Sequence, residues 1–594
     1  LNLLYLPKML GNADLPHYRL QIDKEDLKKL NENLPGSLSD EVFAGTVYLS
    51  EEYKKTVPAV FMHDGTQYDV EVRYRGDNPV HWTRPKRSWQ IKFDKDTPFH
   101  GLRTIKLIIS ADRGYFAEYL NNYRSKKLGL YFPEARYVTL DINGSNHGVY
   151  YQVEDWSSES LEKRSLPSDV NIYATNDQYI QEEQLATRGG SAFDNERFWD
   201  KTLNDKIFAF DNYAEIDTLV QMLTLDNFGE LASDIIDLDA FYKWQVALML
   251  AGSDHQNDTA NVRLYFDNSK GKFTFIPWDL EVGASTPEGI SLATLVSRRI
   301  FSDPRRALER NTLLWEYIQD EDAIQDDFNF YDDAYDALRS VFYRDFKKHD
   351  SNFAFDRKVW EMRQGFEDNL LAIEQAFKDD NSKMDIRFDS DKELLQLDFY
   401  IDNFSGLQLE SISLPVEVPS LAVLYRDTNE NGVLDSRDTW LMQSEVSEDQ
   451  HVEFNKVNYF LHGTQSEGAA KHTLFIQLRN HDGDIIDLEK IRITTVNVIT
   501  GKKVKIKDRR YIDATTFNYI SDINNTIEQF LRENGMFSRS GNSIVLPGGN
   551  HFIREHIIIP RETKLIIMPG AILNFSSGIS LISYSPIEAV GTAA

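Results

Sequence analysis

The chain has no cysteine among its 594 residues. Disulfide bridges and thiolate-ligated zinc are therefore excluded throughout. It also has no apolar run close to the roughly 18 residues that a membrane-spanning helix requires. Residues 1–10 lack the charged start and long apolar stretch of a signal peptide. Because the chain begins with Leu1, we expect an upstream segment to be absent from it.

Basic residues are scarce relative to acidic ones. The chain has 65 Lys and Arg against 94 Asp and Glu, which gives a formal net charge of -29. Sequence-independent binding to nucleic acid, or binding to an anionic lipid surface, requires basic patches. These two partner classes are therefore not expected, although a local basic cluster is enough to hold one phosphate.

The length exceeds what one hydrophobic core usually serves, so we expect several domains. Residues 1–394 predict an α+β domain. Its expected elements are strands at 45–49, 68–74, 89–93, 104–109, 137–142 and 149–153, a helix at 114–128, and mainly helical periodicity over 196–377. Residues 395–508 predict an antiparallel β-sandwich. Residues 509–594 predict the first, truncated rungs of a parallel β-helix, because short strands alternate there with Pro, Gly or charged corners.

The most informative stretch runs from Asp254 to Asp279. Asp254 and Asn261 precede one apolar strand, and Asp279 follows the next. A hydroxyl nucleophile needs a proton acceptor, and a leaving diphosphate needs cations, so phosphoryl transfer calls for one free and one metal-bound carboxylate. We assign the first role to Asp254 and the second to Asp279, with Asn261 as a further ligand of magnesium or manganese. The alternative is that these residues only form turns.

The neighbouring polar residues are assigned less directly. Glu281 lies two positions beyond Asp279 and shares its strand face. His255 and Asp258 are expected to be structural. The interval from Asp254 to Asn261 is longer than that of an ordinary kinase catalytic loop, so Asn257 or Asp258 remains an alternative to Asn261 as the metal ligand.

Lys92 lies among apolar neighbours on a predicted strand, where a lysine is costly unless it meets an anion. It is therefore a candidate phosphate ligand or, alternatively, an exposed strand lysine. Arg73 and Arg75 share a face and either bind phosphate or keep a sheet edge soluble. Glu154 ends a predicted strand after the Asn143-Gly144 turn, where it either pairs with Lys92 or faces water.

A second metal site is predicted between Asp427 and Asp438. The oxygen-ligand positions of a calcium loop are all filled there, with Gly432 at the tight turn. The expected Ca²⁺ ligands are Asp427, Asn429, Asn431, Val433, Asp435 and Asp438. Strand-like flanks favour a structural calcium site over a switch, and the alternative is a plain polar turn.

Taken in order, these motifs resemble the CotH family, the spore-coat kinases that are divergent relatives of protein kinases. The motifs that carry the resemblance are Arg73-Tyr-Arg75-Gly76, Lys86-Arg-Ser-Trp-Gln-Ile-Lys92-Phe93, Leu140-Asp-Ile-Asn143-Gly144 with Gly148-Val-Tyr-Tyr-Gln-Val-Glu154, Asp254 with Asn261, and Ile276-Pro-Trp-Asp279-Leu280. The resemblance implies that Lys92 binds ATP phosphates and pairs with Glu154, that Asp254 is the base, and that Asn261 and Asp279 hold divalent metals. No G-x-G-x-x-G loop is present, so phosphate binding would fall to Arg73 or Arg75.

The C-terminal modules look like an Ig-like domain followed by a right-handed β-helix, which implies a bacterial cell-surface or extracellular location. The leading hypothesis is ATP-dependent transfer to Ser or Thr of a surface or coat protein. The alternative is a non-catalytic pseudokinase that acts in adhesion or surface assembly and binds polysaccharide through its C-terminal modules.

Overall fold

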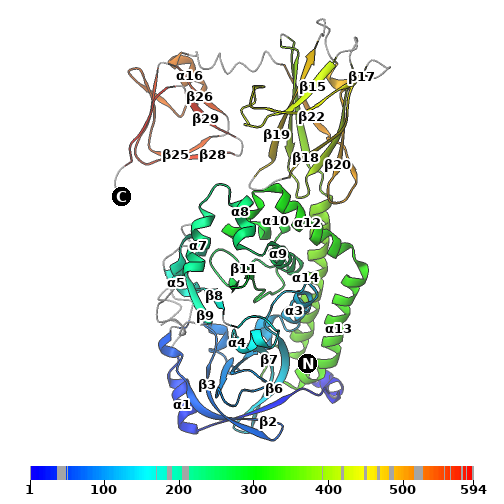
Figure 1. Cartoon of the computed structure of the whole chain (residues 1–594). Coiled ribbons are helices and arrows are strands. Elements are labelled where there is room, and N and C mark those ends of the chain that lie inside the picture. Colours follow the sequence, from blue (N-terminus) through cyan, green and yellow to red (C-terminus); the bar gives the residue numbers. More distant parts are fainter. Residues whose placement is uncertain are drawn as a thin grey trace. The chain divides into compact units, whose positions relative to one another are not determined.

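The computed structural model divides the chain into two compact units, Leu1–Phe377 and Lys378–Ala594 (Figure 1). The residues it describes are 2–11, 13–35, 49, 51–168, 170–182, 190–203, 213–390, 392–415, 421–446, 451–463, 468–479, 487–513, 526–553, 556–561, 563–576, 579–583 and 585–591. The predicted strand at 45–49 falls almost entirely outside them. Within the described part, no helix has the length and apolar character needed to cross a membrane.

The first unit begins with a closed barrel whose strands follow the order β1-β2-β3-β4-β5-β7-β6. The strands are β1 (His17–Ile22), β2 (Val57–His63), β3 (Thr66–Tyr74), β4 (Trp89–Phe93), β5 (Thr104–Ile109), β6 (Ala135–Ile142) and β7 (Ser145–Glu154). Alternate apolar side chains, among them Phe61, Ile91 and Leu140, fill its interior. The predicted Asn143-Gly144 turn joins β6 to β7, and both of its residues have positive φ, at 49° and 78°.

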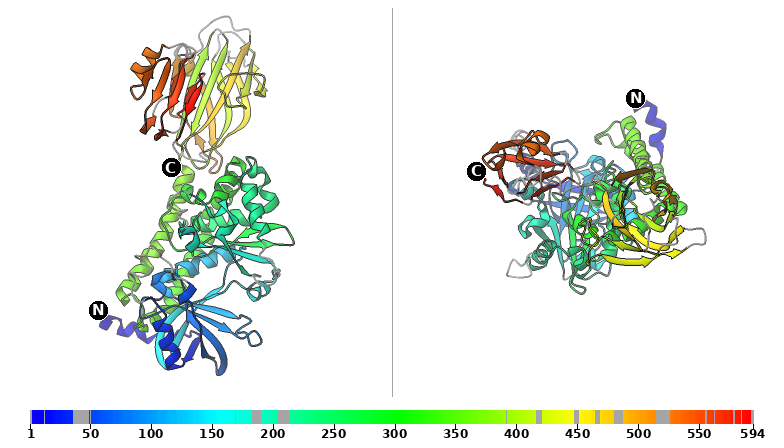
Figure 2. Two further views of the ribbon diagram at one scale, coloured as in Figure 1. Left: turned by 90° about the vertical axis from the view of Figure 1, so that its left-hand side faces the viewer. Right: turned by 90° about the horizontal axis from the view of Figure 1, so that it is seen from above.

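Helices and a second, four-stranded sheet form the rest of this unit. The sheet has the order β11-β10-β8-β9, with β8 (Asn171–Thr175), β9 (Trp199–Leu203), β10 (Arg263–Asp267) and β11 (Lys272–Phe275). The helices are α1 (Lys24–Glu32), α3 (Ala117–Lys127), α4 (Ser158–Glu162), α5 (Asp177–Glu182), α7 (Ala214–Leu223), α8 (Phe228–Ile235), α9 (Leu238–Ala251), α10 (Pro287–Ser291), α11 (Leu295–Phe301), α12 (Pro304–Gln319), α13 (Glu321–Arg344) and α14 (Asn352–Lys378). The two long helices α13 and α14 run alongside both the barrel and the helical part, as Figures 1 and 2 show.

An aromatic core joins the barrel to these helices. Tyr137 and Tyr151 on the barrel strands belong to the same buried cluster as Phe116, Phe342 and Phe355. The cluster extends to Trp278, next to Asp279, so packing of the whole unit fixes the edge of the candidate site.

The second unit starts with two sheets over one hydrophobic core. One has the order β16-β15-β19-β13-β12-β22 and the other β17-β18-β14-β20-β21. Their strands are β12 (Ser382–Asp389), β13 (Leu394–Ile401), β14 (Leu407–Pro415), β15 (Leu421–Arg426), β16 (Thr439–Gln443), β17 (Glu445–Val446), β18 (His451–Leu461), β19 (Ala470–Arg479), β20 (Arg492–Asn497), β21 (Lys503–Val504) and β22 (Asp508–Asp513).

Both predicted boundaries of this two-sheet region require correction. β12 pairs antiparallel with β13, with Ile386 opposite Leu397, so the region begins before residue 395. β22 pairs with β12 and carries the sheet past residue 508. In β12 the charged residues Lys383, Asp385 and Arg387 alternate with Met384 and Ile386, so the segment has too few apolar residues to predict a strand from the sequence.

The last part contains α16 (Ile527–Glu533) and strands that pair mainly in parallel. The strands are β23 (Ser538–Ser540), β24 (Ser543–Leu546), β25 (Gly549–Ile553), β26 (Ile557–Ile559), β27 (Lys564–Ile567), β28 (Ala571–Phe575), β29 (Leu581–Ser583) and β30 (Ile587–Ala589). β24 pairs with β27 and β27 with β30, while β25 pairs with β28 and β26 with β29. This is the pairing expected of successive turns of a coil.

Candidate active site

Asp254 follows directly on the end of helix α9. The helix is terminated by Gly252, whose φ of 62° is left-handed, and a Cβ at Gly252 would lie 2.4 Å from the side-chain nitrogen of Asn369. Glycine is therefore required there. Asp254 is exposed, and within the described part of the chain its carboxylate accepts no hydrogen bond. A carboxylate left free in this way is available to accept a proton.

The side chain of Gln256 connects the Asp254–Asn261 loop to the segment that ends in Asp279. Its amide nitrogen donates to the backbone oxygens of Asn261 (3.1 Å) and Ile276 (3.0 Å). Its oxygen accepts from the indole nitrogen of Trp244 (2.9 Å) and from the backbone nitrogen of Trp278 (3.3 Å). The two candidate segments are thereby held at a fixed separation.

Asn261 and Asp279, the two predicted metal ligands, both adopt a left-handed backbone, with φ of 61° and 56°. This conformation is uncommon for residues other than glycine, and it concentrates at functional sites. The backbone nitrogen of Asn261 donates to Asp177 (3.2 Å). His255 Nδ1 lies 3.3 Å from the backbone oxygen of Asp279, which brings the start of the loop beside the second acid.

Arg113, at the end of the 3₁₀ turn η4 (Ser110–Arg113), holds the carboxylate of Asp279. Its guanidinium is buried, lies over the ring of Trp278, and also contacts Glu118 (3.0 Å) and Asp112 (3.4 Å). Burial disfavours its charge, but the carboxylates of Glu118 and Asp112 outweigh that effect and raise the pKa of Arg113. No motif in the sequence identifies Arg113 as a site residue.

Three more cations follow in a series of electrostatic interactions: Arg75 interacts with Arg113, and Lys106 interacts with both Arg75 and Arg263. Burial lowers the pKa of Lys106, whose amino group lies 2.5 Å from Asp155 and is further disfavoured by nearby Arg75. Burial, with the neighbouring charge of Arg113, lowers the pKa of Arg75 to about 10. Its Nη1 atom is inaccessible and has no hydrogen-bond partner among the described residues. Arg263 is half-buried, and desolvation lowers its pKa. Cations this poorly solvated are expected to meet an anion.

The predicted pairing of Lys92 with Glu154 is wrong. Lys92 is 59% exposed and contacts Glu71 at 3.4 Å. Glu154 is buried and binds Lys163 and Arg164, each at 2.7 Å, which anchors α4 to the end of β7. The barrel register explains the error.

One row of paired side chains on the barrel runs through Arg73, Gln90 and Lys106. Lys106 interacts with Arg263 of β10, so this row lies next to the second lobe, which comprises the four-stranded sheet and the helices that follow the barrel. Lys92 lies two residues farther along β4 than Gln90, where it is opposite Glu71 on β3 and Thr104 on β5. Lys106 on β5, rather than Lys92, is therefore the lysine of these strands that lies toward the second lobe. The pattern used for Lys92 is a lysine among apolar strand residues. Lys106 shows that pattern more strongly, because it lies within Thr104-Ile-Lys-Leu-Ile-Ile109.

The two predicted arginines differ in environment. Arg73 donates to the side-chain oxygen of Gln90 (2.8 Å) and to the backbone of Tyr74, so the barrel surface engages it. Arg75 lies beyond the end of β3 and faces the cations and acids of the site. Of this pair, Arg75 alone has the environment of a phosphate ligand.

The other candidates in the loop are held structurally. Asp258 accepts hydrogen bonds from the Ser191 hydroxyl and the Leu295 backbone and pairs with Arg298, which agrees with its predicted structural role. Asn257 accepts from the backbone of Thr259 and closes the local turn. Both side chains are thus occupied, which argues against their alternative role as metal ligands.

Glu281 points into the same region as Asp279. Burial raises its pKa, while His255 and Arg113 oppose that rise. Within the described part of the chain, no three or more His, Asp or Glu side chains are clustered as ligands of one metal ion. Magnesium is commonly held by only one or two carboxylates together with substrate phosphates. Asp279 and the amide of Asn261 fit that donor set, with the cations nearby for the phosphates.

The predicted calcium loop is a turn closed by its own hydrogen bonds, and calcium binding there stays a prediction. Asp427 accepts from the backbone of Asn431 (3.2 Å) and Gly432 (2.8 Å). The side chains of Asn429 and Asn431 both donate to Asp435, at 3.2 and 3.0 Å, and Asp438 accepts from the Asp435 backbone. The loop is compact, while the backbone oxygen of Val433 and the amide oxygens remain the predicted ligands.

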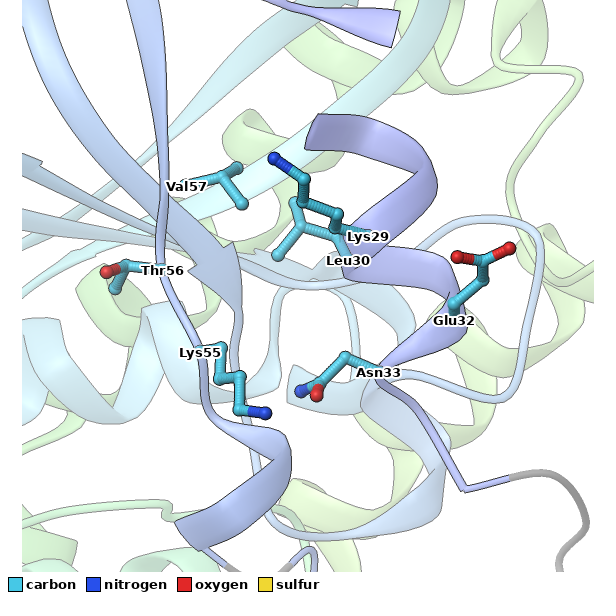
Figure 3. Close-up of a pocket in the computed structure, with 7 residues that line it drawn as sticks. All are labelled: Lys29, Leu30, Glu32, Asn33, Lys55, Thr56 and Val57. Atoms are coloured by element: carbon cyan, nitrogen blue, oxygen red, sulfur yellow. The ribbon is translucent and has the colours of Figure 1, made fainter. Parts of the chain in front are cut away.

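A pocket of about 380 Å³ lies elsewhere in the first unit, between α1 and the start of β2 (Figure 3). Lys55 and Asn33 extend toward one another from its two walls. It is lined by Lys29, Leu30, Glu32, Asn33, Lys55, Thr56 and Val57, none of which belongs to the site around Asp254.

Comparison with known proteins gives two matches. Residues 72–344 match the family model described as CotH kinase protein. The chain is also 24% identical over 278 residues to inner spore coat protein H of Bacillus subtilis (strain 168), which covers 46% of this chain and 70% of that protein. Every candidate residue from Arg73 to Glu281 lies inside the matched range, and the second unit lies outside it.

Proposed function

Because residues 72–344 form a CotH kinase family domain, we propose that this chain transfers the terminal phosphoryl group of ATP to Ser or Thr hydroxyls of a surface or coat protein. The name of its relative, inner spore coat protein H, supports a bacterial coat or surface location. The observation that carries the proposal is the series of poorly solvated, mutually interacting cations Arg113, Arg75, Lys106 and Arg263, of which Arg113 pairs with Asp279.

The proposed roles follow from charge and exposure. Asp254 accepts the proton of the acceptor hydroxyl. The hydroxyl oxygen bonds to the γ-phosphorus while the bond to the bridging oxygen breaks, and its electron pair leaves with ADP. Arg75 and Lys106 stabilise charge on the phosphate oxygens. Asp279 and Asn261 hold Mg²⁺ or Mn²⁺, which when bound neutralises phosphate charge.

The test is transfer of labelled γ-phosphate to the protein itself and to a generic acceptor, with Mg²⁺ and with Mn²⁺. We expect incorporation that falls about 100-fold or more in Asp254→Asn and in Asp279→Asn. Asp239→Asn, at an exposed position on α9, is the matched control and retains the activity. Absence of transfer by the unaltered chain, together with no ATP-induced rise in melting temperature, would refute the proposal.

One observation favours the alternative, a non-catalytic protein that binds polysaccharide. Arg113 occupies the Asp279 carboxylate, and an arginine there competes with a metal ion for the same oxygens. The alternative predicts that melting is unaffected by ATP with either metal, whereas a glycan raises the melting temperature of the second unit. The opposite result, a nucleotide effect without a glycan effect, favours the kinase.

For the second unit we propose an Ig-like β-sandwich followed by the first turns of a right-handed β-helix. The shared core of the two sheets and the parallel ladders support these assignments. We also propose that the 427–438 loop binds a structural Ca²⁺, supported by the oxygen-bearing residues at every ligand position and by the hydrogen bonds that hold Asp427, Asp435 and Asp438 in one turn.

Calcium binding is tested by thermal unfolding with Ca²⁺ and with a chelator. At 100 times the dissociation constant, Ca²⁺ should add about 2.7 kcal/mol to the free energy of unfolding of the second unit. Asp427→Ala should abolish the difference, and Glu489→Ala, an exposed acid on a different turn, should preserve it. A calcium response that survives Asp427→Ala would place the ion elsewhere.

A further inference from the structure

Gln256 is completely buried, and its side-chain amide uses its full hydrogen-bonding capacity. A glutamine amide has two N–H donors and an oxygen with two lone pairs. The donors bind the backbone oxygens of Asn261 and Ile276, and the oxygen accepts from Trp244 and Trp278. A fully satisfied buried amide of this kind is rigid, because any shift leaves a polar group unpaired.

The four partners come from the segments that carry the candidate residues. Trp244 is on α9, whose end leads into Asp254. Asn261 is itself a candidate, and Ile276 and Trp278 immediately precede Asp279. Three of the four contacts are to backbone atoms, so they fix the paths of the two loops. Asn261 and Asp279 have left-handed backbones, which need such restraint because they are intrinsically unfavourable.

We propose that Gln256 is a positioning residue that sets the separation between Asp254, the base, and the ligand pair Asn261 and Asp279. It lies inside the protein and touches neither phosphate nor metal, so it acts only through its neighbours. This inference rests on the proposed phosphoryl transfer. Misplacement of reacting groups by about 1 Å is enough to lower a rate about 100-fold.

Substitution by glutamate separates geometry from packing. Gln256→Glu keeps the size and shape of the side chain, but its ionised carboxylate has no donor for the backbone oxygens of Asn261 and Ile276. Protonation restores one donor. The variant should therefore regain part of its activity as the pH falls, a response that lost packing alone would not give.

Gln245 provides the matched control. It is also a completely buried glutamine, on the same helix as Trp244, but it donates to the Ser297 hydroxyl (3.1 Å), and in the described part of the chain its side chain forms no hydrogen bond to either candidate loop. Gln245→Leu should lower the melting temperature and leave the turnover number of the remaining folded protein unchanged within about threefold.

The experiment measures kcat and the KM for ATP by labelled phosphate transfer, beside melting temperature, for the unaltered chain, Gln256→Glu, Gln256→Leu and Gln245→Leu. We expect kcat to fall about 100-fold in both Gln256 variants with KM within about threefold, and to recover at acid pH only in Gln256→Glu. Equal kcat values in the Gln256→Glu and Gln245→Leu proteins would overturn the positioning role. An inactive unaltered chain would instead refute the proposed function itself, and with it the role assigned to Gln256 in that reaction.

Discussion

At the scale of single residues, the candidate site combines poorly solvated cations with carboxylates. Arg75 and Lys106 are cations whose pKa values are lowered by burial, whereas Asp155 and Asp279 each already contact one cation. The charge of the whole chain is -29, so a polyanion such as ATP is attracted only by a local excess of positive charge. Lys106 should contribute most directly to this attraction. Its side chain is only 14% exposed, so water screens its charge less than that of an exposed lysine.

We predict that Lys106→Met weakens ATP binding at least about tenfold, because a hydrogen bond to a charged group is worth roughly 1.5–3 kcal/mol. Lys92→Met, on the adjacent strand, should change the affinity less than about twofold. Calorimetric titration with ATP and Mn²⁺ measures both. A larger effect at Lys92 would identify Lys92 as the phosphate ligand and refute the choice of Lys106 from the barrel register.

Lys86 belongs to the same sequence motif as Lys92 but has a structural role. Its amino group is buried, 2.5 Å from the equally buried Asp345 and 2.7 Å from the backbone oxygen of Val149. Asp345 also accepts from the Val149 backbone, so this ion pair ties β7 to the end of α13.

We predict that Lys86→Met lowers the free energy of unfolding of the first unit by about 3–5 kcal/mol, because the carboxylate of Asp345 is left buried without a cation. Adding Asp345→Asn should recover part of the loss. Lys92→Met breaks an exposed pair and should cost less than about 1 kcal/mol. Denaturant unfolding gives all three values, and a Lys86 effect no larger than the Lys92 effect would contradict the prediction.

At the scale of elements, the segment after Asp279 packs against the C-terminal end of α9. Gly283 donates to the Ala251 backbone oxygen and Ser285 to that of Gly252, each at 3.0 Å. The approach is so close that a Cβ at Gly283 would lie 2.1 Å from the backbone oxygen of Gly252. Backbone atoms cannot rotate away as a flexible side chain can, so this position admits only glycine.

Gly283→Ala should therefore push the Asp279 segment off α9. We expect a stability loss of about 1–3 kcal/mol or more, typical of overpacking, together with loss of the ATP-induced rise in melting temperature. Gly289→Ala is the control, because its Cβ would meet only the Thr286 hydroxyl at an ordinary 3.4 Å. An unchanged ATP-induced rise in melting temperature in Gly283→Ala would show that the packing of this segment on α9 does not position Asp279.

Much of this arrangement of elements was predictable from alternation and turn residues. The expected strands at 68–74, 89–93, 104–109, 137–142 and 149–153 correspond closely to β3 to β7. Asn261 lies two residues before β10 and Asp279 four residues after β11, so both flank one hairpin as the sequence predicts, while the roles of Asp254, Asn261 and Asp279 stay predictions. Barrel closure, by parallel pairing of β1 with β6, was not predictable, since it depends on contacts between distant strands.

The missed site residues have the same cause. The choice between Lys92 and Lys106 depends on which row of the barrel faces the second lobe. Arg113 meets Asp279 only when the two lobes assemble, and Gln256 contacts segments of the second lobe that are separate in the sequence. Such information is absent from local periodicity, which reports whether a residue faces in or out but not what it meets.

At the scale of the whole molecule, the two compact units each contain a buried histidine whose pKa is lowered to about 4. In the first unit it is His81, which lies against Ser88 and 3.6 Å from Asp112; burial is the main cause, and the cations Arg75 and Arg113 add to it. In the second it is His472, which lies against His462.

The cause for His472 is again burial first, followed by the neighbouring charges of His462 and Arg426. Between about pH 6.5 and pH 4, the unfolded chain binds a proton at each of these positions that the folded chain does not. The free energy of unfolding therefore falls as the pH drops through this window, by up to about 1.4 kcal/mol per pH unit for each histidine, and the loss is complete below about pH 4.

This dependence should be separable by unit, because each histidine belongs to a different one. His472→Gln should reduce the pH slope of the second unit's unfolding between pH 6.5 and 4 and leave that of the first unit unchanged; His81→Gln should do the reverse, so each variant controls for the other. Denaturant unfolding at several pH values, followed by hydrogen exchange resolved along the chain, distinguishes the two units. A slope that changes in both units with either variant would mean that they unfold together, and an unchanged slope in the altered unit would mean that its histidine takes up its proton equally in the folded and unfolded states.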